Sequence, residues 1–120
     1  MIKKVALYLR SSKDRHDVSI DSQRREIEKF ALVSQINRSV VSIPSNIAEG
    51  TSRRTIKEVT RFLNIALGSS YELETQLLLI ANLYKELESE SVILINKINE
   101  IQKMIGGFKK KINQTESLIS

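Results

Sequence analysis

The spacing of apolar side chains in the second half of the chain constrains its fold more than any other feature. Between positions 94 and 112 these side chains recur at alternating steps of four and three, the heptad seam of antiparallel bundles and coiled coils. The seam consists of Leu94, Ile98, Ile101, Ile105, Phe108 and Ile112. It predicts a long helix that begins near residues 88–91, with residues 113–120 as a frayed tail.

A second stripe, from position 59 to position 84, predicts one continuous amphipathic helix of about thirty residues. Thr51, Ser52 or Thr55 is expected to cap its start. The stripe consists of Val59, Phe62, Leu63, Ala66, Ser70, Leu73, Leu77, Ile80 or Ala81, and Tyr84.

Two further features of this helix predict contacts with other elements. Gly68 lies inside the helix and lowers its propensity, so the small-residue patch around it predicts the close approach of another helix. Four leucines lie partly off the stripe, and this surplus apolar surface suggests a further helix or a subunit interface. The patch consists of Ala66, Gly68, Ser69 and Ser70, and the leucines are Leu67, Leu78, Leu79 and Leu83.

An earlier helix is predicted from about residue 22 to the region of Pro44, the only proline in the chain. Asp21 or Ser22 is its expected cap. Its apolar positions at helical spacing are Ile27, Phe30, Val33, Ile36 or Asn37, and Val40.

Pro44 has no N–H to donate to the carbonyl of Val40, and its ring crowds that turn. The helix can kink there and continue to Glu49, or it can stop so that Pro44 begins a new turn. We favour one kinked helix, in which Asn46 and the nearby serines bond the freed backbone groups and Gly50 provides a left-handed stop.

The start of the chain has a different period. Val5, Leu7 and Leu9 alternate with their neighbours over residues 3–12, which is typical of a short strand. The predicted fold is therefore all-α, an antiparallel up-down bundle of three long helices preceded by a strand-like segment.

Composition excludes several classes of site. There is no cysteine, which excludes a disulfide framework and thiolate metal sites, and the one histidine, His16, falls in a polar turn. We therefore expect neither a metal nor a cofactor. No apolar run approaches the length of a membrane span, and Lys3 and Lys4 do not open a signal peptide, so we expect a cytoplasmic protein.

Positive charge is concentrated in the first half of the chain. Residues 1–61 hold thirteen basic and seven acidic side chains, a net charge of +6, against +5 for the whole chain. A basic half favours polyanionic partners such as RNA or DNA, and a solvated basic surface is the alternative.

The strongest binding candidates are Arg53, Arg54, Lys57 and Arg61. The last three share one helix face near a helix N-terminus, a place that favours phosphate. The alternative is a solvated face beside Glu58.

Lys109, Lys110 and Lys111 form a second basic cluster. It lies where the last helix is expected to end, so the alternative to binding is that these lysines complement the helix dipole.

Three carboxylates, those of Glu49, Glu72 and Glu74, could suggest an acidic site, but their spacing is not that of a metal pair. Glu72 and Glu74 face different sides of one helix. We interpret these two and Glu49 as hydrogen-bond partners of Ser45, Asn46 or a neighbouring helix terminus.

Residues 32–112 resemble the four-helix-bundle proteins encoded by intervening sequences in bacterial 23S ribosomal RNA genes, a family similar to the accessory variability protein of diversity-generating retroelements. The segments that match are LVSQINRSVVSIPSNIAEG from Leu32, FLNIALGSS from Phe62 and ELETQL from Glu72. The structural motif that they contain comprises Pro44, Asn46, Glu49, Gly50 and Gly68.

The resemblance implies an up-down bundle, here without the usual first helix of the family. It also implies a ring-like homopentamer that binds nucleic acid or a reverse transcriptase through basic surfaces. No enzymatic activity is implied.

Residues 5–31 instead resemble the start of a serine recombinase of the resolvase and invertase type. Tyr8, Arg10 and Ser12 match that family's Tyr-x-Arg-x-Ser motif, in which Ser12 would be the nucleophile and Arg10 a phosphate-binding partner. Phosphoryl transfer by serine needs several more cations, which are missing here, so we expect an inactive remnant.

The sequence thus predicts a recombinase-like remnant over residues 1–31, a helical bundle over 32–112 and a tail over 113–120. The predicted function is that of a non-enzymatic, oligomeric bundle that binds nucleic acid. One alternative is a structural bundle that binds only proteins, and the other is a recombinase fragment that acts on DNA.

Overall fold

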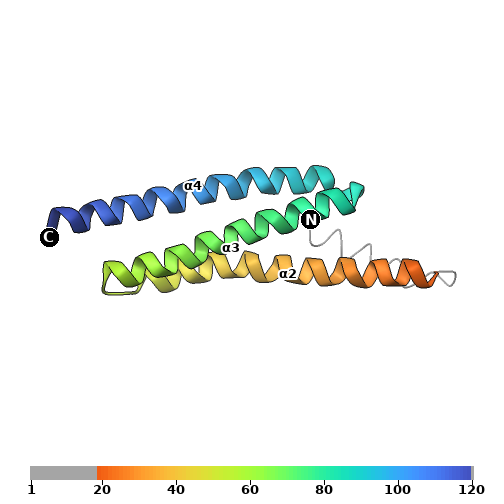
Figure 1. The fold of residues 1–120 in the computed structure, drawn as a ribbon, viewed down its shortest axis with the longest axis horizontal. Helices are drawn as coiled ribbons and strands as arrows, with labels where there is room; N and C mark the ends of the chain where they lie inside the picture. Colours follow the sequence, from red (N-terminus) through yellow and green to blue (C-terminus); the bar gives the residue numbers. More distant parts are fainter. Residues whose placement is uncertain (1–18, 120) are drawn as a thin grey trace.

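The computed structural model describes residues 19–119, which fold into three long helices (Figure 1). These are α2 (Ile20–Thr51), α3 (Ile56–Leu83) and α4 (Glu88–Ile119), with the short 3₁₀ helix η1 (Lys85–Leu87) between the last two. Successive helices run antiparallel, and residues 19–119 contain no strand, so the prediction of an all-α up-down bundle is confirmed. The strand predicted over residues 3–12 lies outside the described residues.

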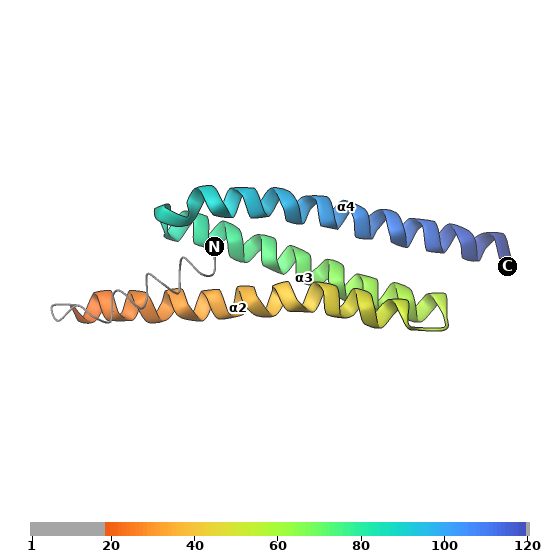
Figure 2. The same cartoon turned by 180° about the vertical axis from the view of Figure 1, so that it is seen from behind.

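Helix α3 is the centre of the bundle. Both α2 and α4 pack against it, and no Cα atom of α2 lies within 8 Å of a Cα atom of α4. Figures 1 and 2 view the molecule from opposite sides, and both show α3 between the other two helices. The described helices therefore form a bundle that is open along one side, between α2 and α4.

The caps of the first two helices are hydroxyl side chains. The Ser19 hydroxyl accepts a hydrogen bond from the backbone N–H of Ser22 at 3.2 Å, so the predicted caps Asp21 and Ser22 lie inside the first turn of α2. The Thr55 hydroxyl accepts one from the N–H of Glu58 at 3.2 Å, as one of the three predicted caps. Each cap satisfies a backbone donor that has no partner within its helix.

The stripe predicted for α3 forms much of the hydrophobic core. All of its members from Leu63 to Tyr84 are buried, whereas Val59 and Phe62 are half-buried. On α4 the predicted seam also faces the core, although Phe108, its last member but one, is 42% exposed. The core cluster comprises Val33, Ile36, Ile43, Leu63, Ala66, Leu73, Leu77, Ile80, Tyr84, Leu87, Ile98 and Ile105.

The stripe predicted for α2 is only partly correct. Val33 and Ile36 are buried, but Ile27 and Phe30 are 69% and 61% exposed. The face that packs on α3 instead includes polar residues: Lys29 and Ser39 are buried beside the apolar positions. Apolar spacing cannot reveal such an interface, because its contacts are partly hydrogen bonds.

Helix α2 continues through Pro44 to Thr51, so the prediction of one helix that passes the proline is confirmed. The Asn46 side-chain amide donates to the carbonyl oxygen of Ser42 at 2.7 Å and to its hydroxyl at 3.0 Å. The predicted left-handed stop at Gly50 is wrong, since no glycine of the described chain has a positive φ. Gly50 is a buried helical residue that packs against α3, and Ser52 caps the helix.

The predicted close approach at Gly68 is also wrong. A β-carbon there would meet nothing within 4 Å, and the residue is exposed. Its neighbours Ala66, Ser69 and Ser70 are buried, and the Ser69 hydroxyl lies 2.7 Å from the hydroxyl of Ser42 on α2. Residues 113–119, which were expected to fray, continue α4 as regular helix.

Candidate nucleic-acid interface

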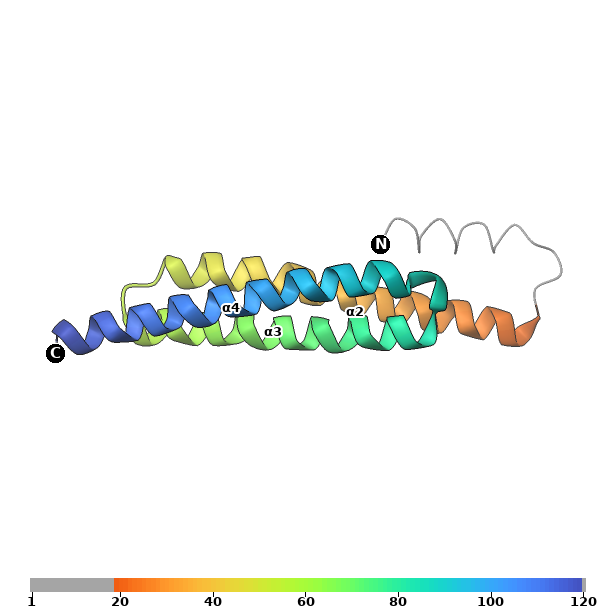
Figure 3. The same ribbon diagram turned by 90° about the horizontal axis from the view of Figure 1, so that it is seen from above.

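The fold brings the two predicted basic clusters to the same end of the bundle. The turn between α2 and α3, which precedes the cluster on α3, lies at this end together with the last turns of α4 (Figure 3). Asn113 on α4 lines a depression with Lys57 and Arg61, and a second depression with Lys109 and Lys110. Residues more than 50 positions apart in the sequence, such as Lys57 and Asn113, thus form one continuous surface. We call this surface the basic end, and its cations are Arg53, Arg54, Lys57, Arg61, Lys109, Lys110 and Lys111.

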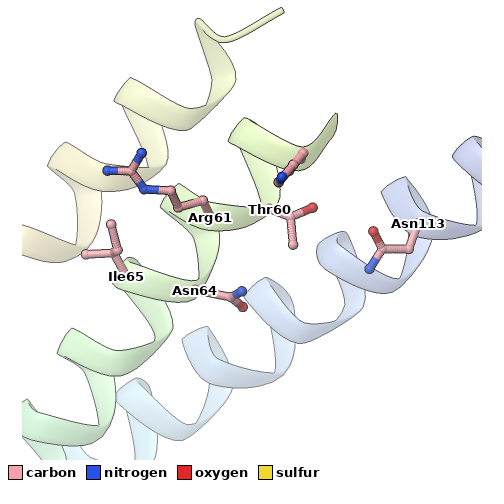
Figure 4. A pocket seen from close by; sticks show the side chains of 6 residues that line it. Thr60, Arg61, Asn64, Ile65 and Asn113 are labelled. Atoms are coloured by element: carbon pink, nitrogen blue, oxygen red, sulfur yellow. The ribbon is translucent and has the colours of Figure 1, made fainter. Parts of the chain in front are cut away.

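The first depression has a volume of about 710 Å³ and is lined by residues of α3 and by Asn113 of α4 (Figure 4). The second has a volume of about 490 Å³ and follows α4. None of the described side chains that line either depression is a carboxylate. The residues of the first are Lys57, Thr60, Arg61, Asn64, Ile65 and Asn113, and those of the second are Gly106, Lys109, Lys110, Asn113 and Gln114.

Two of the predicted cations have structural partners. The Arg53 guanidinium donates to the carboxylate of Glu49 and lies 4.9 Å from the centre of the Phe62 ring. The Arg61 guanidinium lies 5.4 Å from the same ring and extends away from Thr60 (Figure 4). These contacts hold the turn between α2 and α3 by an ion pair and by cation–π attraction, so Arg53 is first a structural residue.

The remaining cations of the basic end make no ion pair within residues 19–119. Arg54, Lys57, Lys110 and Lys111 are exposed, and Lys109 is half-buried. Their charges are therefore not neutralised by a carboxylate of the described chain.

The α3 N-terminus is less suited to phosphate than the sequence indicates. The Thr55 hydroxyl caps it and also donates to the carboxylate of Glu58 at 3.2 Å. A negative side chain in the first turn already occupies the positive end of the helix dipole. The basic side chains, rather than this helix end, are the attractive part of the surface.

The dipole interpretation of the lysine cluster does not fit the structure. Because α4 continues to Ile119, its last turn contains no basic residue, and Lys111 lies eight positions before its end. A helix dipole acts mainly within the last turn. Binding and solvation remain as explanations of Lys109, Lys110 and Lys111.

The carboxylates that were considered as an acidic site lie apart. Glu49 pairs with Arg53, and Glu74 accepts a hydrogen bond from the Gln102 amide of α4 at 2.9 Å. Glu72 is exposed. Residues 19–119 contain no group of three His, Cys, Asp or Glu side chains that could hold a metal ion. The recombinase-like residues Tyr8, Arg10 and Ser12, and also His16, lie outside the described part of the chain.

Sequence reasoning missed the neutral polar residues of the basic end. Thr60 and Asn64 continue the helical spacing of Lys57, so a polar stripe on α3 was a signal that could have been read. Asn113 had no such signal, because its position depends on how α4 is aligned against α3.

The open side of the bundle contains the second candidate surface, an apolar groove of about 930 Å³ between α2 and α4. Among the lining residues that the structure describes, Lys97 alone is charged, and Met104 is 71% exposed. The groove is lined by Ile36, Val40, Ile43, Pro44, Ile47, Leu63, Leu73, Leu77, Leu94, Lys97, Ile98, Ile101, Met104, Ile105 and Phe108. The off-stripe residues Leu78, Leu79 and Leu83 are about half-exposed elsewhere on α3, and Leu67 packs against the core.

None of the helices formed by residues 19–119 has a stretch long and apolar enough to cross a bilayer. No curated protein and no solved structure matches the chain.

The family model of the 23S rRNA-intervening sequence protein matches residues 10–107. The match begins upstream of residue 32, where the predicted bundle domain begins. Helix α2 passes residue 31, the predicted end of the recombinase-like segment, without interruption. The recombinase-like start itself stays a prediction. With most of its length matched and three antiparallel helices, the chain belongs to the 23S rRNA-intervening sequence protein family.

Proposed function

We propose that this chain is a non-enzymatic, oligomeric, cytoplasmic protein that binds nucleic acid through its basic end. The observation that carries the proposal is the convergence of Lys57 of α3 with Lys109 and Lys110 of α4 around Asn113. Cations on two helices can contact successive phosphates of one strand, whereas a cluster on one helix contacts fewer.

The charge of the surface supports this proposal. Basic residues that lack a carboxylate partner can neutralise phosphates and release the condensed counterions, which is the main source of affinity in sequence-independent binding. Arg54, Lys57, Lys110 and Lys111 meet this condition within the described chain. Arg53 is engaged by Glu49 and contributes less.

The test is a titration of labelled single-stranded and double-stranded RNA and DNA, read by fluorescence anisotropy at several salt concentrations. We expect the logarithm of the affinity to fall linearly with the logarithm of salt, by about 0.7 per phosphate contact on single strands and about 0.9 on B-DNA. The combined Arg54→Ala, Lys57→Ala and Lys110→Ala variant should lose most of this slope. Lys85→Ala with Lys103→Ala removes charge outside the basic end and should retain it. The absence of binding at low salt would overturn the proposal.

Self-association through the apolar groove is the second part of the proposal. The groove exposes Val40, Met104 and Phe108, and one of its lining residues within the described part of the chain, Lys97, is charged. Two copies of a chain with a net charge of +5 repel each other, so they associate most readily through a surface with little charge. Because its rims are apolar, the rim of one copy can enter the groove of the other.

The groove also supports the rival function, a structural bundle that binds only proteins, of which a reverse transcriptase is one conceivable partner. An oligomer without affinity for nucleic acid would favour it. The recombinase alternative has a separate test, which is covalent capture of a DNA strand by Ser12. Unchanged behaviour of Ser12→Ala in all assays would remove that alternative.

A further inference from the structure

Thr60 has a feature that the basic side chains around it do not explain. Its hydroxyl oxygen is buried and has no hydrogen-bond partner among the described residues. A buried hydroxyl without a partner is costly, and most such groups in proteins are bonded. Threonine on a helix has two accessible χ1 rotamers, so a change of rotamer, a rotation of about 120°, can turn the hydroxyl toward the depression that Thr60 lines.

The surroundings of Thr60 favour an anion. Thr60, Asn64 and Asn113 lie around the gap between α3 and α4 (Figure 4), and Lys57 lies one turn before Thr60 on α3. Hydroxyl and amide groups donate hydrogen bonds to phosphate oxygens, and lysine adds a positive charge. Among the side chains that the structure describes, no carboxylate lines this depression or the adjoining one with Lys109 and Lys110.

We propose that Lys57, Thr60, Asn64 and Asn113 form a phosphate-binding site between α3 and α4. It rests on the proposed function, because its natural ligand is then one backbone phosphate of the bound nucleic acid. The site holds that phosphate by neutral donors, while the cations on either side attract the rest of the strand. It thereby fixes where the strand crosses from α3 to α4.

The first test compares Thr60→Val with Thr75→Val in RNA binding. Valine has nearly the shape of threonine and lacks only the hydroxyl. Thr75 is an exposed threonine of the same helix whose hydroxyl already bonds the carbonyl of Tyr71 at 3.0 Å. Thr60→Val should weaken binding roughly tenfold, as expected for one hydrogen bond to a charged group, without changing the salt slope. Thr75→Val should bind like the parent chain. Equal affinity of both variants would overturn the phosphate site and leave the proposed function intact.

The second test uses inorganic phosphate and the full chain, with side-chain amide signals recorded by nuclear magnetic resonance. Phosphate should shift the amide signals of Asn64 and Asn113, whereas chloride at equal ionic strength should not. Shifts with phosphate in a chain that fails to bind RNA or DNA would support the site and reject the proposed function. Shifts that appear with a nucleic-acid strand but not with inorganic phosphate would assign the site to backbone phosphates. The absence of shifts with both ligands would overturn the site.

Discussion

A β-carbon placed on Gly50 would lie 2.9 Å from the β-carbon of Phe62, closer than real side chains approach. The contact joins the last turns of α2 to the second turn of α3, and Phe62 is also the ring against which Arg53 and Arg61 lie. Glycine is therefore required at position 50 by the packing of two helices and not by its backbone conformation, which is helical.

Replacement of Gly50 by alanine should destabilise the chain, and replacement of Gly68 should stabilise it. Gly68→Ala gains about 0.5–1 kcal/mol, because alanine is the better helix former and a β-carbon there meets nothing. Gly50→Ala has the same propensity gain, but overpacking against Phe62 costs about 1–3 kcal/mol. Urea unfolding followed by circular dichroism measures both changes. Two stabilising substitutions would show that α2 and α3 are not this close.

The fold could be predicted in the regions where apolar spacing is strict. On α3 and α4 the buried positions are mostly apolar, so the steps of three and four identified both helices and their buried faces. Helix α2 differs because its contact with α3 includes Lys29, Ser39 and Ser42, which no hydrophobic pattern marks.

The candidate site could be predicted only in its parts. The cations on α3 and on α4 are visible as local clusters, but their convergence depends on the alignment of the two helices, which places Asn113 beside both. The same holds for Gly50. Its partner Phe62 is on another helix, so the sequence offered a glycine stop as the simpler explanation.

A buried lysine should make the stability of the chain depend on pH. The Lys29 ammonium is almost fully buried and donates to the Glu86 carboxylate at 2.7 Å, and it lies 4.5 Å from the centre of the Tyr84 ring. The hydrogen bond from Lys29 holds the pKa of Glu86 below its ordinary value of 4.5, whereas burial raises the pKa of Tyr84. A carboxylate with a lowered pKa stabilises the folded state above pH 4.5 and loses this effect as the pH falls through its folded pKa.

Glu86→Gln should therefore destabilise the chain at neutral pH by roughly 1–2 kcal/mol, since the buried Lys29 ammonium would lose its ion pair with Glu86, which itself is half-exposed. The difference from the parent chain should shrink as the pH is lowered below 4.5. Urea unfolding from pH 7 to pH 3 measures it. Glu88→Gln is the control, because the Lys85–Glu88 pair is exposed at 3.7 Å. A constant difference across this range would contradict the role of the ion pair.

The hydroxyls of Ser42 and Ser69, 2.7 Å apart, should be energetically coupled across α2 and α3. The Ser69 side chain is buried, so removal of either partner leaves a polar group with fewer hydrogen bonds. A double-mutant cycle with Ser42→Ala and Ser69→Ala should give a coupling of about 0.5–1.5 kcal/mol. Ser69→Ala combined with Ser34→Ala, a half-buried serine elsewhere on α2, should be additive. Additivity of the Ser42 and Ser69 changes would mean that the hydroxyls do not bond.

The apolar groove should determine the oligomeric state. Met104→Asp places a carboxylate at the rim of the groove, where association with a second copy would have to bury it without a partner. Met104 is 71% exposed, so the substitution should leave the folded chain intact. Val92→Asp is the matched control, because Val92 is an exposed apolar residue of α4 outside the groove.

Light scattering should give a multiple of the chain mass for the parent and for Val92→Asp, and the mass of one chain for Met104→Asp. A parent chain that stays monomeric at high concentration, or a Met104→Asp variant that assembles as the parent does, would mean that a second copy does not occupy the groove.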